Sequence, residues 1–211
     1  MKPKRKEELE ATRLENLWAG DFGDAYTDRN AQAGKGREAF WTNLLKKYSI
    51  EKGVLEVGCN MGINLRVIST LIAPHMVFGV DINEKALELL RASTPKVNTI
   101  WSPARDLPFR DARFELVFTA GVLIHQPESS LALVMSEIVR CTYRYVLCLE
   151  YYASETVAIP YRGQERALFK RDYGRLYREL FPLLQLEEKG NLGKDEGWDD
   201  ITYWLFRKKE A

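Results

Sequence analysis

The sequence has few of the residues that hold structural metals or disulfides. It contains three cysteines, and none of them stands in the Cys-x-x-Cys spacing of a metal-ligand pair. Cys59, Cys141 and Cys148 are far apart, and isolated cysteines in apolar segments usually act as small apolar residues. We therefore expect no metal site, and a reducing, cytoplasmic setting rather than a secreted one.

Long apolar runs and an excess of one charge are also missing. No run approaches the roughly 20 apolar residues of a membrane span, and the charged start MKPKRKEELE contains no apolar signal segment. The 31 basic residues balance 30 acidic ones, so there is no overall attraction to nucleic acid or to an anionic membrane. We expect one folded domain with neither kind of partner, and its oligomeric state stays open.

Short apolar runs alternate with helical patterns through the middle of the chain, which predicts a parallel α/β sheet with helices on both faces. Near the end, two strands are separated only by a loop, which predicts an antiparallel hairpin. The expected strands are 54–57, 76–80, 97–101, 114–120, 145–149, 183–187 and 202–207, and the expected helices are 4–18, 37–48, 62–71, 84–91, 128–140 and 172–181, with a loop or broken helix over 19–36.

The stretch VLEVGCNMGINL predicts a strand, a glycine turn and a helix that begins near Gly62. Gly58 allows a sharp turn and a close approach of a ligand, and the free N–H groups of the helix start are partly positive. A nicotinamide cofactor usually needs Gly-x-Gly-x-x-Gly, whose third glycine is missing here. The amino-acid end of a smaller nucleoside could instead lie along Gly58 and Cys59.

Asp81 stands at the end of the second predicted strand, 23 positions after Gly58. A carboxylate there can accept hydrogen bonds from both hydroxyls of a ribose. It could instead cap the following helix. Asn83 is better placed for the cap, so we favour ribose binding for Asp81.

Four segments in order resemble the successive motifs of class I methyltransferases that use S-adenosylmethionine: VLEVGCNMGINL, VFGVDIN, SPARDLPFRDARFELVFTAGVLIH and DDITYWLFRK. The resemblance implies a Rossmann-like sheet of seven strands, parallel with an antiparallel C-terminal hairpin, and S-adenosylhomocysteine as the product. It implies that the cofactor contacts Glu56, Gly58, Cys59, Asn60, Gly62, Asn64, Asp81, Ile82, Pro103, Ala104, Arg105, Ala120 and Gly121.

Two further segments, LWAGDFGDAYTDRN and IPYRGQERALFKRDYG, resemble a smaller clade of methylases that occur with pseudaminic acid biosynthesis, a route to a bacterial sugar acid. This resemblance implies a small and anionic substrate.

The sequence departs from the usual family pattern at two places. Asn60 stands where members often have glycine, but asparagine tolerates positive φ, so we expect the turn to persist with its amide near the methionine carboxylate. Pro103 stands where members often have aspartate, so we expect the adenine to rely on backbone groups near Ala104 and Arg105 and on packing against Ile82.

His125 follows the fourth strand in GVLIHQP, where strand ends of this family face the methyl group. It is a candidate general base, since histidine titrates near neutral pH. It could equally hold the loop and close over the cofactor. His75 follows Pro74 in a turn, where we expect it on the surface.

The segment 151–175 leaves the fifth strand on the ligand-binding edge and is our candidate for a substrate-side insertion. Its arginines could bind a carboxylate or phosphate, although its charges could also form a solvated helix face. The substrate candidates here and nearby are Asn30, His125, Glu150, Tyr152, Tyr161, Arg162, Lys170 and Arg171.

Residues 1–50 form the candidate lid, and residues 51–211 the methyltransferase domain. Trp18, Tyr26 and Arg29 would close over the cofactor, or else dock the first helix through an apolar patch. We expect methyl transfer to O or N of a sugar acid or nucleotide-linked amino sugar. A methyltransferase of another small molecule and a non-catalytic cofactor-binding scaffold are the alternatives.

Overall fold

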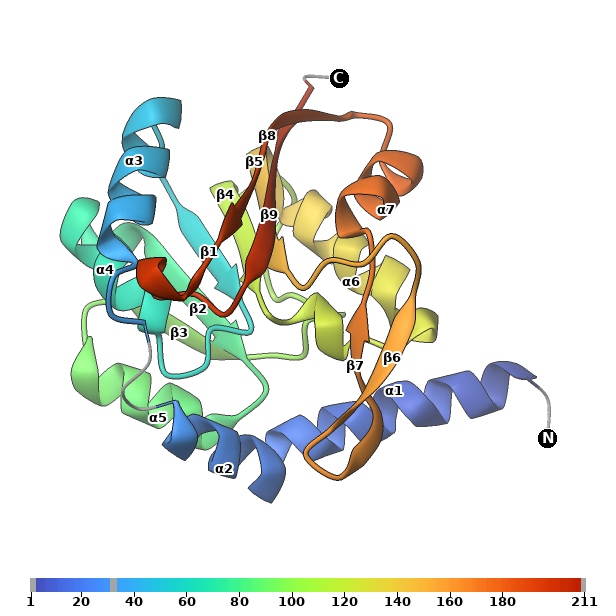
Figure 1. The fold of residues 1–211 in the computed structure, drawn as a ribbon. Coiled ribbons are helices and arrows are strands. Elements are labelled where there is room, and N and C mark those ends of the chain that lie inside the picture. Colours follow the sequence, from blue (N-terminus) through green and yellow to red (C-terminus); the bar gives the residue numbers. More distant parts are fainter. Residues whose placement is uncertain (1–2, 31–33, 210–211) are drawn as a thin grey trace.

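The structure is a computed structural model that describes residues 3–30 and 34–209, with side chains from residue 8 onward. Its centre is a seven-stranded sheet with the order β3-β2-β1-β4-β5-β9-β8 (Figure 1). The first five of these strands are parallel, and β9 and β8 are antiparallel, so the predicted fold is confirmed. The strands are β1 Val54–Val57, β2 Val77–Asp81, β3 Asn98–Trp101, β4 Phe114–Ala120, β5 Thr142–Glu150, β8 Leu184–Leu192 and β9 Ile201–Lys208.

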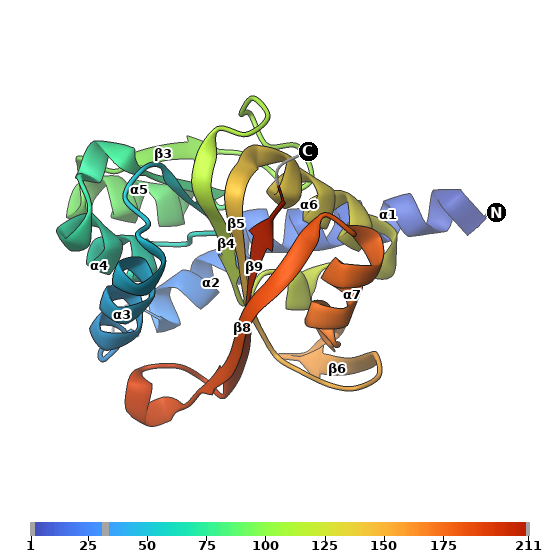
Figure 2. The same cartoon turned by 90° about the horizontal axis from the view of Figure 1, so that it is seen from above.

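Helices cover both faces of this sheet (Figure 2). On β4, Leu116 and Phe118 pack toward α3, α4 and α5, while Val117 packs toward α6 and α7. This alternation of neighbouring side chains divides the core into two apolar layers. The helices are α3 Glu38–Tyr48, α4 Ile63–Leu71, α5 Glu84–Ser93, α6 Glu128–Cys141 and α7 Tyr173–Leu180, and the short 3₁₀ turns are η1 Pro74–Met76, η2 Leu123–His125 and η3 Lys194–Glu196.

The candidate insertion is a β-hairpin, so the alternative of a solvated helix face is wrong. Strand β6 (Val157–Tyr161) pairs antiparallel with β7 (Gln164–Lys170). The tip residues Arg162 and Gly163 both have positive φ, of 48° and 79°. Two such residues suit a two-residue hairpin turn, and the Arg-Gly pair is the sequence feature that could have predicted it.

The N-terminal region forms two helices, α1 (Pro3–Ala19) and α2 (Asp21–Arg29), separated at Gly20, so the broken helix rather than the loop is confirmed over 19–30. Helix α1 runs beside the β6–β7 hairpin, where Arg13 donates to the carbonyl oxygen of Glu165 at 3.3 Å (Figure 1). Helix α2 reaches α5 through an ion pair between Asp28 and Lys85 at 2.8 Å. Both helices therefore cover the edge where the parallel strands end, although residues 1–2 and 31–33 of the candidate lid lie outside the described residues.

No helix in the described part of the chain is long and apolar enough to cross a membrane. His75 is exposed in η1, where the sequence placed it on the surface.

Candidate active site

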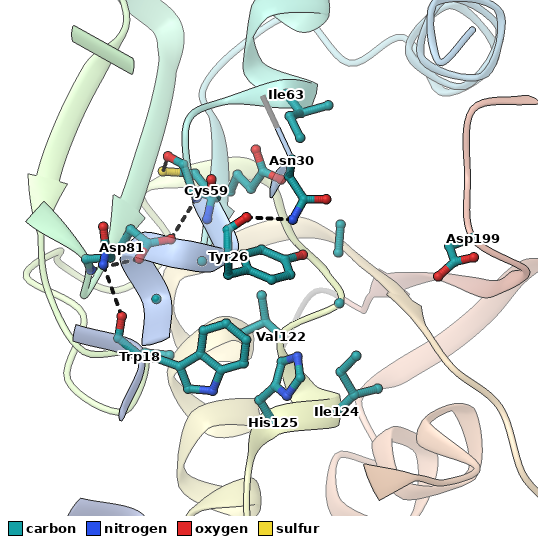
Figure 3. Close-up of a pocket in the computed structure, with 18 of the residues that line it drawn as sticks. Trp18, Tyr26, Asn30, Cys59, Ile63, Asp81, Val122, Ile124, His125 and Asp199 are labelled. Carbon is teal, nitrogen blue, oxygen red and sulfur yellow. Dashed lines mark hydrogen bonds between the residues drawn. The ribbon is translucent and has the colours of Figure 1, made fainter. Parts of the chain in front are cut away.

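A cavity of about 650 Å³ lies at the carboxyl ends of β1, β2 and β4, where open α/β sheets commonly bind ligands. Residues of helices α1 and α2, of the β6–β7 hairpin and of the β8–β9 loop also line it. Figure 3 shows Asp81 and Asp199 on opposite sides of this space, with Tyr26, Trp18 and His125 between them. We call the side of Asp81 the cofactor end and the side of Asp199 the acceptor end.

The turn after β1 keeps its shape without the missing glycine. Asn60 has a φ of 48°, as expected for an asparagine in a left-handed position, and its backbone N–H donates to Asp81 Oδ2 at 2.7 Å. Its side chain is engaged by the protein, because Oδ1 accepts from Met61 N at 2.7 Å and Nδ2 donates to Thr27 Oγ1 at 3.1 Å. The amide therefore ties the turn to α2, and this arrangement does not support the expected contact with a methionine carboxylate.

Gly62 does not line the cavity. A Cβ atom there would lie 2.3 Å from Leu90 Cδ1, so this glycine lets the start of α4 pack against α5 rather than against the strand. Its φ of 75° adds a second reason for glycine. Gly58, Cys59 and Asn64 do line the cavity.

Glu56 is a buried carboxyl group on the cavity wall. Its Oε1 accepts from Asn64 Nδ2 at 2.6 Å, whereas Oε2 has no hydrogen-bond partner among the described residues. Burial raises the pKa of Glu56 to about 8. A buried carboxyl oxygen without a partner, in a residue that lines a cavity, is suited to a cationic group of a ligand.

Arg37 was not predicted from the sequence, yet it lines the cavity beside this carboxyl group. It donates to Asn64 Oδ1 and to the carbonyl oxygen of Gly197, both at 2.9 Å, and its guanidinium lies 3.9 Å from the Trp198 ring centroid. Since Gly197 is 160 residues away along the chain, no local pattern could have placed Arg37 here.

Asp81 and Asn83 connect the cofactor end to the lid helices. Asp81 Oδ1 accepts from the N–H of Asn83 at 2.9 Å, and burial raises the pKa of Asp81. Asn83 Oδ1 caps α5 by accepting from Ala86 N at 2.8 Å, as expected, and its Nδ2 donates to Trp18 O at 3.2 Å and Asp24 Oδ1 at 2.7 Å. One side chain therefore caps a helix and holds the α1–α2 junction.

Beyond Asp81 the cavity is lined by Ile82, Ser102 and Ala104. Pro103 and Arg105 do not reach it, so their side chains make no contribution to its lining. Arg105 instead forms a two-point ion pair with Glu15 of α1, from Nε at 2.5 Å and from Nη2 at 2.9 Å. Its partner Glu15 lines the cavity and was not predicted.

His125 ends η2 and lies on the cavity wall. Its Nδ1 is 2.6 Å from the carbonyl oxygen of Ala167, so Nδ1 carries the proton and Nε2 presents a lone pair. Burial lowers the pKa of His125 to about 4, which keeps the ring neutral. Its centroid lies 4.3 Å from that of Trp18 (Figure 3). The geometry therefore favours His125 as a hydrogen-bond acceptor that closes the site, rather than as a strong base at neutral pH.

Glu150 is fully buried and does not line the cavity, so it cannot bind substrate directly as predicted. Its Oε1 accepts from the N–H groups of Val122 and Leu123 at 3.1 Å, and Oε2 accepts from Ile124 at 3.2 Å. Burial raises its pKa to about 7, although these bonds oppose the rise. Glu150 therefore holds the η2 turn that carries His125.

Three other substrate candidates also lie away from the cavity. Arg171 is 2% exposed, and its guanidinium packs over Phe169 and donates to the carbonyl oxygen of Gln126 at 3.1 Å. Lys170 lies over the Tyr151 ring, and Tyr152 is exposed beside Trp204. The hairpin pairing of β7 directs these side chains elsewhere, whereas Asn30, Tyr161 and Arg162 line the cavity.

Three cations line the cavity without acidic partners among the described residues. Arg29, Arg162 and Lys194 line the cavity, and none of them has a carboxylate within 4.0 Å in the described part of the chain. Asp199 accepts a hydrogen bond from the Tyr151 hydroxyl at 2.6 Å. Lys194 and Asp199 come from the β8–β9 loop and were not predicted.

The remaining predicted contacts, Trp18, Tyr26, Ala120 and Gly121, also line the cavity. Burial raises the pKa of Tyr26 to about 12, so its hydroxyl stays protonated. The described residues contain no group of three His, Cys, Asp or Glu side chains that could hold a metal ion.

Comparison with known proteins agrees with this architecture. Residues 54–144 match the family described as a methyltransferase domain, which is less than half of the chain. A curated protein of Haemophilus influenzae, described as uncharacterized, is 30% identical over 99 residues. That match covers 44% of this chain and only 39% of the relative.

Solved structures resemble the whole chain at low identity. Burkholderia thailandensis 1,6-didemethyltoxoflavin-N1-methyltransferase, with its substrate and S-adenosylhomocysteine, has a TM-score of 0.71 at 14% identity and covers 100% of this chain and 92% of its own. Magnesium protoporphyrin IX methyltransferase from Synechocystis, with S-adenosylhomocysteine, has a TM-score of 0.70 at 14% identity and covers 94% and 99%. The matches confirm the predicted fold, and residues 54–144 match a methyltransferase domain.

Proposed function

We propose that this chain transfers the methyl group of S-adenosylmethionine to a small, anionic metabolite. The observation that carries the proposal is the pair of carboxyl groups, the buried Glu56 and the partly buried Asp81, near the ends of adjacent parallel strands in one cavity. Such a pair suits a ligand with hydroxyls at one point and a cation at another. A nicotinamide dehydrogenase is disfavoured, because the glycine turn lacks the third glycine.

The residues present fit the cofactor in three places. Asp81 would hold the ribose hydroxyls, since its two oxygens can accept further hydrogen bonds beside those from the N–H groups of Asn60 and Asn83. The unpartnered Oε2 of Glu56 would accept from the ammonium group, and Arg37 would hold the carboxylate. When bound, the cofactor supplies a methyl group already activated by a sulfonium charge.

The chain's own contribution is position and exclusion of water. Trp18 and Tyr26 of the lid helices cover the cavity, and Glu150 fixes the turn that carries His125. His125 Nε2 would accept a hydrogen bond from an O–H or N–H of the acceptor and so orient it. The choice between transfer to O and to N depends on that acceptor.

The acceptor is proposed to carry a carboxylate or phosphate. Arg29, Arg162 and Lys194 supply cations to the cavity lining, and planar guanidinium groups suit such anions. A sugar acid or a nucleotide-linked amino sugar is the leading candidate, in line with the resemblance to the pseudaminic acid clade. We also propose residues 1–50 as a cap on the domain 51–211, with 151–175 on the substrate side, and a cytoplasmic setting.

A second candidate is a planar ring compound. Trp18, Phe22 and Tyr161 form an aromatic cluster around His125, with Trp18 and Tyr161 stacked at 6.5 Å between ring centroids. The two solved relatives named above have ring compounds in their names. A planar ring would stack against this aromatic cluster.

Calorimetry with S-adenosylmethionine and S-adenosylhomocysteine tests the proposal on wild type and on Asp81→Ala. Micromolar binding that disappears in the folded variant supports it, and methyl transfer to sugar acids and to ring compounds can then be compared. A folded wild type that binds neither ligand would favour a non-catalytic scaffold.

A further inference from the structure

Next to Asp81 the cavity is lined by Ile82, Ser102 and Ala104, and one carboxylate, that of Glu15 of α1, is tied to Arg105 beside Ala104. If Asp81 holds the ribose, a base attached to that ribose lies in this space. The inference below rests on the proposed function in that respect.

We propose that Glu15 accepts a hydrogen bond from the exocyclic amino group of adenine, so that a lid residue selects the base of the cofactor. An amino group is a donor and needs an acceptor when it is buried. Of the described acidic residues that line the cavity, Glu56 and Asp199 lie elsewhere, beside Asn64 and Tyr151, and Asp81 serves the ribose. Glu15 is the carboxylate left at this end.

The Glu15 carboxylate is held in place. Arg105 donates to both of its oxygens, at 2.5 and 2.9 Å, in a fork geometry that fixes the plane of the carboxylate. Each oxygen retains a free lone pair for a further donor. Arg105 directly follows Ala104, which lines the same wall, so the ion pair joins α1 to the loop after β3.

The loop itself offers a poorer acceptor. The hydroxyl of Ser102 donates to the carbonyl oxygen of Asp106 at 2.6 Å, and residue 103 is a proline without a polar side chain. The Glu15 side chain is 21% exposed, so water only partly screens it. A base with a carbonyl group in place of the amino group would place its carbonyl oxygen against the carboxylate. Both groups are acceptors, so such a base would bind weakly.

The same helix connects this contact to the acceptor. Trp18 lies three residues after Glu15, on the same face of α1, and its ring packs 4.3 Å from that of His125. Recognition of adenine by Glu15 would therefore hold the Trp18 ring against His125. A cofactor with another base would leave α1 less firmly closed.

The test compares S-adenosylhomocysteine with S-inosylhomocysteine, which has a carbonyl in place of the amino group, by calorimetry. Wild type is expected to prefer the adenine ligand by roughly 10- to 100-fold. Glu15→Gln is expected to reduce that ratio to below about threefold, because a glutamine amide can accept from adenine or donate to the carbonyl. The matched control is Glu8→Gln, an exposed position on the same helix.

The ratio of the two affinities is measured on one protein, so a general loosening of the lid affects both ligands and cancels. An unchanged ratio in Glu15→Gln, with both ligands bound, would overturn the role of Glu15 and leave the proposed function intact. Failure of folded wild type to bind either ligand would overturn both.

Discussion

The two ends of the cavity are built in different ways. The cofactor end consists of strand ends and tight turns, where Asp81 is partly buried and accepts from the backbone N–H groups of Asn60 and Asn83. The acceptor end consists of side chains such as Arg162 and Lys194, which are exposed and come from a hairpin tip and a loop. A site built from the backbone is specific for one ligand. Long exposed side chains can be substituted to suit another substrate with little loss of folding stability.

The largest expected effect comes from removing one carboxylate at each end, which tests whether the two ends of the cavity bind different ligands. Asp81→Asn is expected to weaken S-adenosylhomocysteine binding by roughly 100-fold, since it loses charge-assisted hydrogen bonds to two ribose hydroxyls. Asp199→Asn is the matched change at the acceptor end and should leave that affinity within about twofold. Calorimetry on both variants measures this, and equal losses would contradict the division of the cavity.

Glu150 lies beneath the acceptor end and should affect folding as well as turnover. Glu150→Ala leaves three buried N–H groups with fewer partners, so we expect a loss of roughly 2–4 kcal/mol in the free energy of unfolding. Urea denaturation measures the loss. Glu155→Ala, at an exposed position, should change the stability by less than about 0.5 kcal/mol. A similar small change in both variants would show that Glu150 does not hold the turn.

The raised pKa of Glu56, about 8, makes the cofactor end sensitive to pH. At pH 7 its carboxyl group is mostly protonated, and an ammonium partner would favour the ionised form. Binding of S-adenosylmethionine is therefore expected to release a proton. Its affinity should rise by up to roughly tenfold for each pH unit as the pH increases towards 8. Calorimetry in buffers of different ionisation enthalpy detects this release, and Glu56→Gln should abolish it.

The same group affects stability without ligand. Because the folded pKa is raised, Glu56 favours the folded state fully below its unfolded pKa, near 4.5. That contribution is lost as the pH rises through 8. The free energy of unfolding should therefore fall more steeply between pH 5 and pH 8 in wild type than in Glu56→Gln, and parallel curves would argue against a raised pKa.

The smallest effects are expected at the rim of the acceptor end. Arg162→Ala and Lys194→Ala should each raise the KM of an anionic acceptor by roughly 3- to 10-fold, because one screened cation is lost from the site. The affinity for S-adenosylhomocysteine should not change. Arg166→Ala, at an exposed position away from the cavity, is the control, and an equal rise in its KM would point to general charge attraction.

The same contrast explains what could be predicted from the sequence. Gly58, Asn60 and Asp81 lie within short segments whose apolar pattern places them at strand ends, so the cofactor end follows from local order. Arg37, Glu15 and Asp199 meet the cavity only through the packing of distant segments, which no local period records.

Glu150 and Arg171 show a second limit. The sequence placed both near the right edge of the sheet, but six successive buried residues end β5, so its pattern does not tell which way Glu150 points. Arg171 follows a hairpin strand that was not predicted, and its direction depends on that pairing. The choice between a loop and a broken helix stayed open for 21–29, because glycine and aspartate are frequent there and tertiary contacts outweigh local propensity.

Asn83 has a kinetic consequence. Its amide holds the α1–α2 junction at Trp18 and Asp24, and these helices lie across the cofactor end. Exchange of product for fresh methyl donor would then require these hydrogen bonds to open, together with the contacts of Thr27, Asp28 and Glu15. A shorter residue that still caps α5 would speed arrival and departure together, so that turnover could change while the equilibrium affinity stayed nearly constant.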